Sequence, residues 1–228
     1  LERGRRLPGQ PGDLEMAQFD TTRDVDVHMA SDGANMSCVD CHTAAKHQMK
    51  GKSYSLSSMN RNRVQCEECH GAEPHAKEIL NEHTLKVSCQ ACHIPTYAKV
   101  NPTKMRWDWS TAGRLRDGQP YEEKDAQGDD VYMSIKGSFV WGRNVKPEYQ
   151  WFDGTASHYL LGDPVEEVPV PLNRLHGRYD DPGSKIVPAK VHRARQPWDE
   201  QARIMVQPKL ADGKPGEGAF WKDFDMDR

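Results

Sequence analysis

Apolar residues are sparse along this chain, and few stretches show a regular period. Residues 75–86, HAKEILNEHTLK, combine good helix formers with helical apolar spacing, which predicts a helix. Residues 130–142, DVYMSIKGSFVWG, predict a short pair of strands. Elsewhere in residues 25–100 the period is weak and indicates short helices joined by loops.

Three regions are expected from the distribution of residue types. Residues 1–24 are polar and read as an arm or linker. Residues 25–100 hold all six cysteines and seven of the ten histidines, whereas residues 101–228 hold all six tryptophans and no cysteine. Turn signals mark the last region at 126–130, 152–155 and 180–184. Because this region is also rich in proline, the expected fold is mostly irregular with short helices and little β structure.

Composition narrows the class of protein. Only 36% of the 228 residues are hydrophobic, so we expect another kind of group to fill part of the interior. The net charge is −3 without a basic run, which argues against nucleic-acid binding. No window approaches the roughly 20 apolar residues of a membrane span. The first residue is Leu and no apolar leader follows it, so we expect a mature product or a piece of a longer polypeptide.

All six cysteines lie in three Cys-x-x-Cys-His motifs, which is the attachment signature of c-type haem. The two thiols add to the vinyl groups of one porphyrin, and the adjacent imidazole ligates its iron. Three covalent haem c groups are therefore predicted, held by Cys38, Cys41 and His42, by Cys66, Cys69 and His70, and by Cys89, Cys92 and His93.

Zinc binding and thiol redox chemistry also use Cys-x-x-Cys pairs. A disulfide framework would distribute its cysteines along the chain to close long loops. Three copies that each retain the histidine, with no cysteine left over, favour haem. The predicted fold class is thus a multihaem cytochrome c, with short helices around stacked haems.

Further histidines offer a second axial ligand to each iron. His47 and His75 each lie five residues beyond a proximal histidine, on the proximal side of their own haem. We therefore expect both to ligate neighbouring haems and to hold the haems in a stack. His83 and His28 are further candidates. For His158 and His176, which like His192 lie beyond the motifs, a structural or surface role is expected.

The three motifs occupy only residues 38–93, so the macrocycles must lie close together. Close macrocycles exchange electrons quickly and supply apolar bulk. Six ionised propionates would change the net charge from −3 to about −9, which favours a basic docking partner.

Several strings in the sequence resemble the octahaem tetrathionate reductase family of periplasmic c-type cytochromes. They include NMSCVDCHTAAKHQMKGK, CEECHGAEPH, CQACHIPTYAK, TKMRWDWSTAGR, IKGSFVWGRNVKPEYQWFDGT, KVHRARQPWDE and GAFWKDFDMD. The resemblance implies the last three haems and the haem-free tail of such a protein. It also implies that His192, within KVHRARQPWDE, is a ligand. The family's catalytic haem has a lysine ligand, and no motif here ends in lysine, so no catalytic residue is carried over.

The leading hypothesis is an electron-transfer module with three bis-histidine haems, located in the periplasm or outside the cell. Its expected partners are other haem proteins or redox proteins, an upstream haem segment, or further copies of the chain. One alternative is a reductase of tetrathionate or of nitrogen oxyanions such as nitrite, or of hydroxylamine. Another is a polymeric cytochrome wire, in which His28 ligates a haem of the adjacent chain. The tryptophan-rich tail is expected to wrap the haems or to form an interface.

Overall fold

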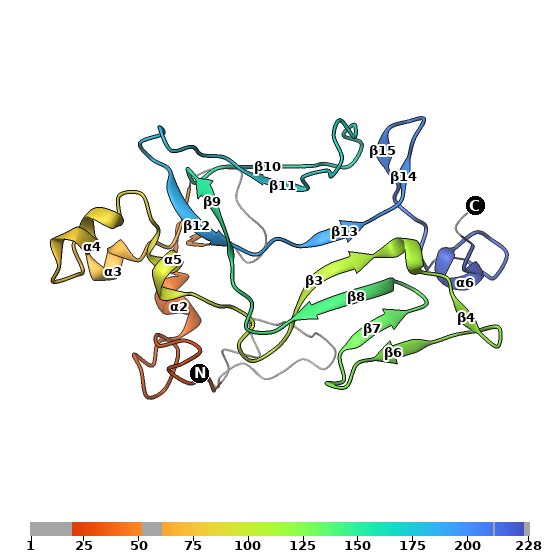
Figure 1. Ribbon diagram of the computed structural model, residues 1–228, viewed down its shortest axis with the longest axis horizontal. Coiled ribbons are helices and arrows are strands. Elements are labelled where there is room, and N and C mark those ends of the chain that lie inside the picture. Colours follow the sequence, from red (N-terminus) through yellow and green to blue (C-terminus); the bar gives the residue numbers. More distant parts are fainter. Residues whose placement is uncertain (1–19, 52–60, 212, 226–228) are drawn as a thin grey trace.

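The computed structural model describes residues 20–51, 61–211 and 213–225, so most of the arm expected at 1–24 lies outside the described residues. Four short helices gather at one end of the molecule, strands occupy the remainder, and a last helix lies at the opposite end (Figure 1). The described helices are α2 (Cys38–Cys41), α3 (Glu67–His70), α4 (Glu78–His83), α5 (Cys89–His93), the 3-10 turn η1 (Trp109–Thr111) and α6 (Phe220–Asp223). The helix expected at 75–86 is thus present in a shorter form.

The expectation of little β structure is wrong. The described strands are β1 (Ala44–Ala45), β2 (Gln48–Met49), β3 (Thr103–Asp108), β4 (Leu115–Arg116), β5 (Gln119–Pro120), β6 (Glu122–Lys124), β7 (Asp130–Met133), β8 (Gly137–Gly142), β9 (Glu148–Phe152), β10 (Ala156–His158), β11 (Asn173–Leu175), β12 (Lys185–Ala189), β13 (Arg193–Arg195), β14 (Trp198–Asp199) and β15 (Ile204–Met205). Strands this short show little alternation. The prolines also led to this wrong expectation. Pro188 lies within β12, which pairs with β9 in a two-stranded ribbon. Such a strand has one edge without a partner strand, where a residue that lacks an N–H is tolerated.

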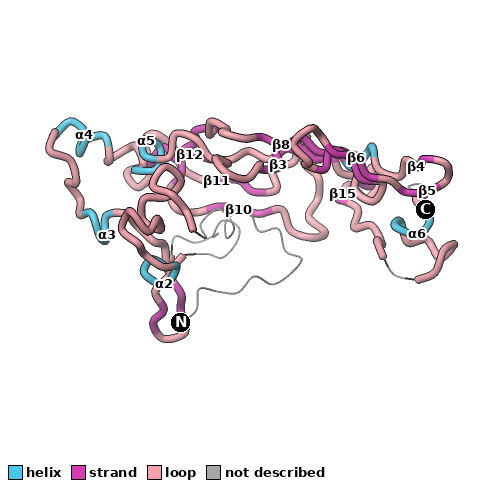
Figure 2. The backbone as a smooth tube through the Cα atoms, turned by 90° about the horizontal axis from the view of Figure 1, so that it is seen from below, coloured by secondary structure: helices cyan, strands magenta, loops and turns pink. Residues whose placement is uncertain are grey.

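A five-stranded sheet in the order β13-β3-β8-β7-β6 organises the C-terminal half. β7 and β8 pair antiparallel, which confirms the strand pair expected at 130–142. β3 pairs antiparallel with β8, whereas the distant β13 joins β3 in parallel. The strands form a long layer, and α2 and α3 lie to one side of it (Figure 2).

This sheet has its own aromatic core. Trp107 on β3 lies 5.2 Å from Trp109 and 5.8 Å from Phe139 on β8, measured between ring centres. Phe220 on α6 contacts Trp109 at 6.2 Å. The ammonium group of Lys104 lies 3.9 Å from the ring centre of Phe139, a cation–π contact. Many rings of the tail therefore pack on one another.

The helical end has almost no apolar core made of protein side chains. Among the described residues before 101, Ala30 is the one buried hydrophobic residue. Several apolar side chains there are exposed, namely Val27, Val39, Met49, Val64, Ile79, Leu80, Leu85, Ile94 and Val100. Packing of these side chains on one another therefore does not stabilise this end.

The β9–β12 ribbon connects the two ends. Ile186 on β12 exchanges two backbone hydrogen bonds with the segment before α5: Ser88 N donates to Ile186 O, and Ile186 N donates to Lys86 O. The Lys86 ammonium group donates to the carbonyl oxygens of Tyr179 and Asp181 in the loop before β12. The third motif is thereby held against the β structure.

Ser134 provides a test of the sheet's packing. It is 1% exposed, accepts a hydrogen bond from Tyr121 N at 2.8 Å and donates to Arg114 O at 2.6 Å. Ser134→Ala leaves these backbone groups without their partner, so we expect the free energy of unfolding to fall by about 1–3 kcal/mol in urea titrations followed by circular dichroism. The matched control is S157A on the exposed face of β10, expected within about 0.5 kcal/mol of the parent. Equal effects of both variants would contradict the assigned network.

Candidate haem-binding site

Each Cys-x-x-Cys-His motif folds as one helical turn, on α2, α3 and α5. The turn is closed by backbone hydrogen bonds such as His42 N to Cys38 O at 2.8 Å and His70 N to Cys66 O at 3.0 Å. Residues three and four apart share a helix face, so the turn presents both thiols and the imidazole together. All six cysteines are free. In the first motif the turn is stabilised at its start, where Asp40 accepts hydrogen bonds from the backbone and hydroxyl of Ser37.

Two of the three proximal imidazoles face a second imidazole. The ring centres of His28 and His70 are 5.9 Å apart, and those of His75 and His93 are 6.0 Å apart. An imidazole nitrogen ligates a metal ion at about 2 Å, so two rings on opposite sides of one metal have centres about 6 Å apart. The ring-centre distances of both pairs match this spacing. The ring planes differ by 72° in the first pair and by 17° in the second.

Asn81 on α4 holds His75 in place. Its side-chain oxygen accepts from His75 N at 2.9 Å and lies 3.2 Å from Nδ1 of the same ring. Its side-chain nitrogen donates to His75 O at 2.9 Å. Occupation of Nδ1 leaves Nε2 available as a ligand, which is the usual arrangement at metal sites.

The first motif has a different environment. His42 Nδ1 lies 2.8 Å from the carbonyl oxygen of Lys50, so Nε2 is again the nitrogen free to ligate. No ring contact joins His42 to a second imidazole within the described part of the chain. Among the described residues, the proximal histidines of the second and third motifs each face another imidazole, whereas that of the first motif does not.

The other predicted ligands lie apart from these pairs. His47 is exposed in the turn between β1 and β2, and His83 is exposed at the end of α4. His192 is exposed, and its Nδ1 lies 3.0 Å from Lys104 O near β3. His158 pairs with Asn173, and the backbone oxygen of His176 accepts from Asp153 N. Of the predicted distal ligands, the structure thus brings His28 and His75 to proximal histidines.

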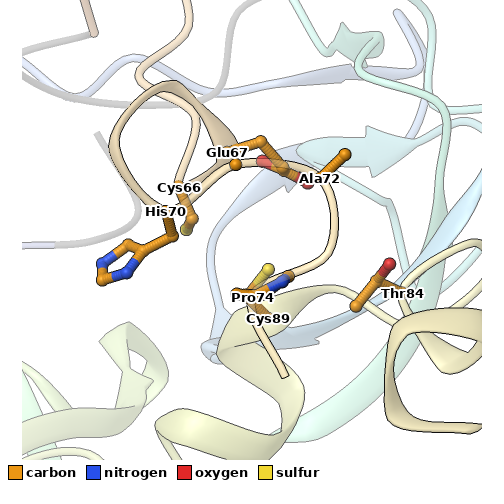
Figure 3. A pocket seen from close by; sticks show the side chains of 8 residues that line it. Cys66, Glu67, His70, Ala72, Pro74, Thr84 and Cys89 are labelled. Atoms are coloured by element: carbon orange, nitrogen blue, oxygen red, sulfur yellow. The ribbon is translucent and has the colours of Figure 1, made fainter. Parts of the chain in front are cut away.

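The second and third motifs meet at their first cysteines. Cys66 and Cys89 line one small hollow between α3 and α5, and His70 is also among its lining residues (Figure 3). Burial raises the pKa of the Cys66 thiol, and the adjacent Cys89 thiol raises it further. Burial likewise raises the pKa of Cys41, followed by the effect of Cys69 in the second motif. Thiol redox sites have a lowered thiol pKa, so this environment does not favour that alternative.

Two ion pairs attach the second motif to its neighbours. Glu68, inside the motif, accepts from the Lys50 ammonium group at 2.7 Å. Glu67, beside it, pairs with Lys185 on β12 at 3.2 Å. A backbone hydrogen bond lowers the pKa of Glu67, and Lys185 lowers it further. The α3 turn is therefore linked both to the loop after the first motif and to the β9–β12 ribbon.

The donor set fits haem better than zinc. A structural zinc ion needs four ligands, and no group of three or more His, Cys, Asp or Glu side chains is placed to hold a metal ion within the described residues. Paired thiols, an adjacent imidazole and opposed imidazoles are instead the requirements of a covalently attached haem with two axial histidines. These features define a multihaem c-type cytochrome.

Comparisons with known proteins agree. The family model "Cytochrome c bacterial" matches residues 104–228, and "Cytochrome c7 and related cytochrome c" matches residues 21–100. The chain belongs to the bacterial cytochrome c family. It is related to octahaem cytochromes, because it is 42% identical to the octaheme cytochrome c of Shewanella oneidensis over 93% of its length, with a TM-score of 0.81.

The chain covers 47% of that octahaem protein, about half of its length. None of the curated proteins matches the chain. No helix among the described residues is both long enough and apolar enough to cross a membrane.

Sequence reasoning missed the residues that orient the imidazoles. A backbone carbonyl such as that of Lys50 leaves no sequence signal, because every residue has one. Asn81 did have a signal, since it lies six residues after His75 in the stretch predicted to be helical. Neither was predicted.

Each motif should attach its haem independently. Replacing Cys89 and Cys92 together by Ala removes both thioether bonds of the third motif, so we expect the mass of the denatured chain to fall by one haem. The control variant H192A retains all six cysteines and should keep every haem. An unchanged haem mass in the C89A/C92A variant would contradict the attachment assignment.

Proposed function

We propose that this chain carries three haem c groups and conducts electrons along them. The observation that carries the proposal is the pair of imidazole couples, His28 with His70 and His75 with His93, each with the spacing of two axial ligands. Bound haem supplies one-electron exchange between ferric and ferrous iron. The chain's own residues would attach the haems and orient the proximal imidazoles, and in two of the three motifs a second imidazole would ligate the iron.

The pairing supports ligand assignments for two of the proposed haems. His75 follows the second motif but serves the third, as cross-ligation requires. His28 precedes the first motif but serves the second. Each pair joins two different segments, so the ligands also hold neighbouring haems in fixed relation. We infer no role in these two pairs for His47, His83 or His192.

The positions of the cysteines support a row with the second haem in the middle. Cys66 of the second motif lies beside Cys89 of the third. Cys69, at the other end of the second motif, lies close enough to Cys41 of the first to raise its pKa. If each cysteine attaches to an edge of its porphyrin, the edges of neighbouring porphyrins would approach one another at these points. Electrons passing between the first and third haems would then use the second.

The surroundings of the motifs also suit haem. Exposed apolar side chains such as Val39, Ile79 and Leu85 lie at this end, although they have little apolar protein surface to cover them. A porphyrin face buries such side chains favourably. We propose that residues 25–100 form the haem-bearing region and that residues 101–228 form a separately packed tail.

The wider setting is part of the proposal. The relative that matches is an octaheme cytochrome c, and the chain corresponds to about half of it, so we infer that the three haems continue a longer row on an upstream segment. Family membership and the cysteine usage support a periplasmic or extracellular location, with a redox protein as partner.

A reductase is the second candidate, favoured by one observation. His42 has no imidazole opposite it among the described residues, so the first haem is the place where a substrate would reach iron. Tetrathionate, nitrite and hydroxylamine are the substrates that the octahaem resemblance suggests. The polymeric wire loses its main support, because His28 faces His70 of its own chain.

Removal of one distal ligand should free one iron. We expect His75→Ala to convert about one haem in three from low-spin to high-spin, because nothing else fills that sixth position. Resonance Raman spin-state bands of the oxidised protein provide the measurement. The control H83A replaces an exposed histidine on α4 and should leave the spectrum unchanged. A fully low-spin H75A variant would refute the ligand assignment.

Binding of carbon monoxide separates the two candidate functions at the first haem. Carbon monoxide binds ferrous haem where the sixth position is open or easily displaced. We expect at most one haem per chain to bind it, and H28A to add one more because the second iron then opens. Two or more binding haems in the parent chain would be incompatible with both histidine pairs.

A further inference from the structure

Gly51 lies directly against the imidazole ring of His42. A Cβ atom built on Gly51 would lie 2.6 Å from both Cε1 and Nδ1 of that ring, a separation that real Cβ atoms do not reach. The backbone at Gly51 has φ +76°, a conformation that disfavours other residues. Glycine is therefore needed here both for the backbone and for the close approach of the ring.

The segment that carries Gly51 is held in place from several directions. Lys50 N donates to Thr43 O at 2.8 Å, and Gly51 N donates to Asn62 O at 2.5 Å. The Lys50 ammonium group is paired with Glu68 of the second motif at 2.7 Å. These contacts fix the Lys50 carbonyl oxygen where His42 Nδ1 meets it at 2.8 Å.

We propose that Gly51 is a positioning residue for the first haem, because its missing side chain allows the Lys50 carbonyl to hold the His42 ring. This inference rests on the proposed function, in which His42 ligates iron through Nε2. A hydrogen bond from Nδ1–H to a carbonyl makes the imidazole a stronger electron donor. A stronger donor favours ferric over ferrous iron, so the contact lowers the reduction potential of the first haem.

A methyl group at position 51 must displace either the ring or the segment. The ring would be bonded to iron and the segment is anchored at Thr43, Asn62 and Glu68, so neither moves without disturbing the hydrogen bond. The expected result is a weaker Nδ1–carbonyl contact and a higher potential for the first haem. The second and third haems do not use this contact and should keep their potentials.

Gly71 provides a matched control. It follows His70 of the second motif directly and has φ +74°, nearly that of Gly51. A Cβ atom at Gly71 would meet nothing within 4 Å. Gly51→Ala and Gly71→Ala both place a side chain at a positive φ next to a haem motif, but only the first change presses on a proximal imidazole.

The experiment is a spectroelectrochemical titration of the haem-loaded parent, G51A and G71A. We expect one of the three one-electron steps to shift upward in G51A, while the titration of G71A matches that of the parent. An unshifted G51A curve, or an equal shift in G71A, would overturn the positioning role.

Two further measurements keep this proposal distinct from the proposed function. Haem mass per chain and the low-spin signals of the parent test haem attachment and ligation without reference to Gly51.

Lys50→Met removes the ion pair to Glu68 but leaves the Lys50 carbonyl and Gly51 in place. We expect K50M not to reproduce the upward step, and a K50M titration identical to that of G51A would show that the ion pair, and not Gly51, controls the potential.

Discussion

Opposition of two imidazole rings about 6 Å apart is the constraint on which the helical end of this protein depends. Each pair joins segments that are distant in sequence: His28 lies 42 positions before His70, and His75 lies 18 positions before His93. An iron atom between such rings would link the segments as firmly as a packed core does. Such links would explain how this region keeps a defined shape although Ala30 is the one buried hydrophobic residue among its described residues.

The two halves of the chain are stabilised in different ways. The tail is built like an ordinary β protein, with a five-stranded sheet and rings such as Trp107, Trp109 and Phe139 packed together. The helical end has few buried apolar side chains among its described residues, so bound haem would supply its apolar contacts. The β9–β12 ribbon joins them through the bonds of Ile186 to the segment before α5, so the tail positions the third motif. A tail with its own packed core would give bound haems a rigid support, which favours constant distances between them.

Local features were predictable from the sequence, and distant pairings were not. The Cys-x-x-Cys-His turns, the β7–β8 pair and a helix near Glu78–His83 each depend on a few adjacent residues. Both His47 and His75 were expected to reach a neighbouring haem, because each is tethered to the proximal side of its own haem; of the two, the structure brings His75 near another motif's histidine, and His93 was not predicted as its partner. The partner of His28 was not predicted, since it depends on how the chain returns over 42 positions. The β content was underestimated in part because pairings such as that of β13 with β3 join residues 87 positions apart, Arg193 with Arg106, with no local signal.

The most direct test of the paired imidazoles is low-temperature EPR of the fully oxidised chain with spin integration. The account predicts low-spin ferric signals from at least two of the three proposed haems. Because the ring planes differ by 72° in the His28–His70 pair and by 17° in the His75–His93 pair, these two signals should differ in g anisotropy, with the larger anisotropy for the near-perpendicular pair. High-spin signals from two or more haems would contradict the pairing on which the account rests.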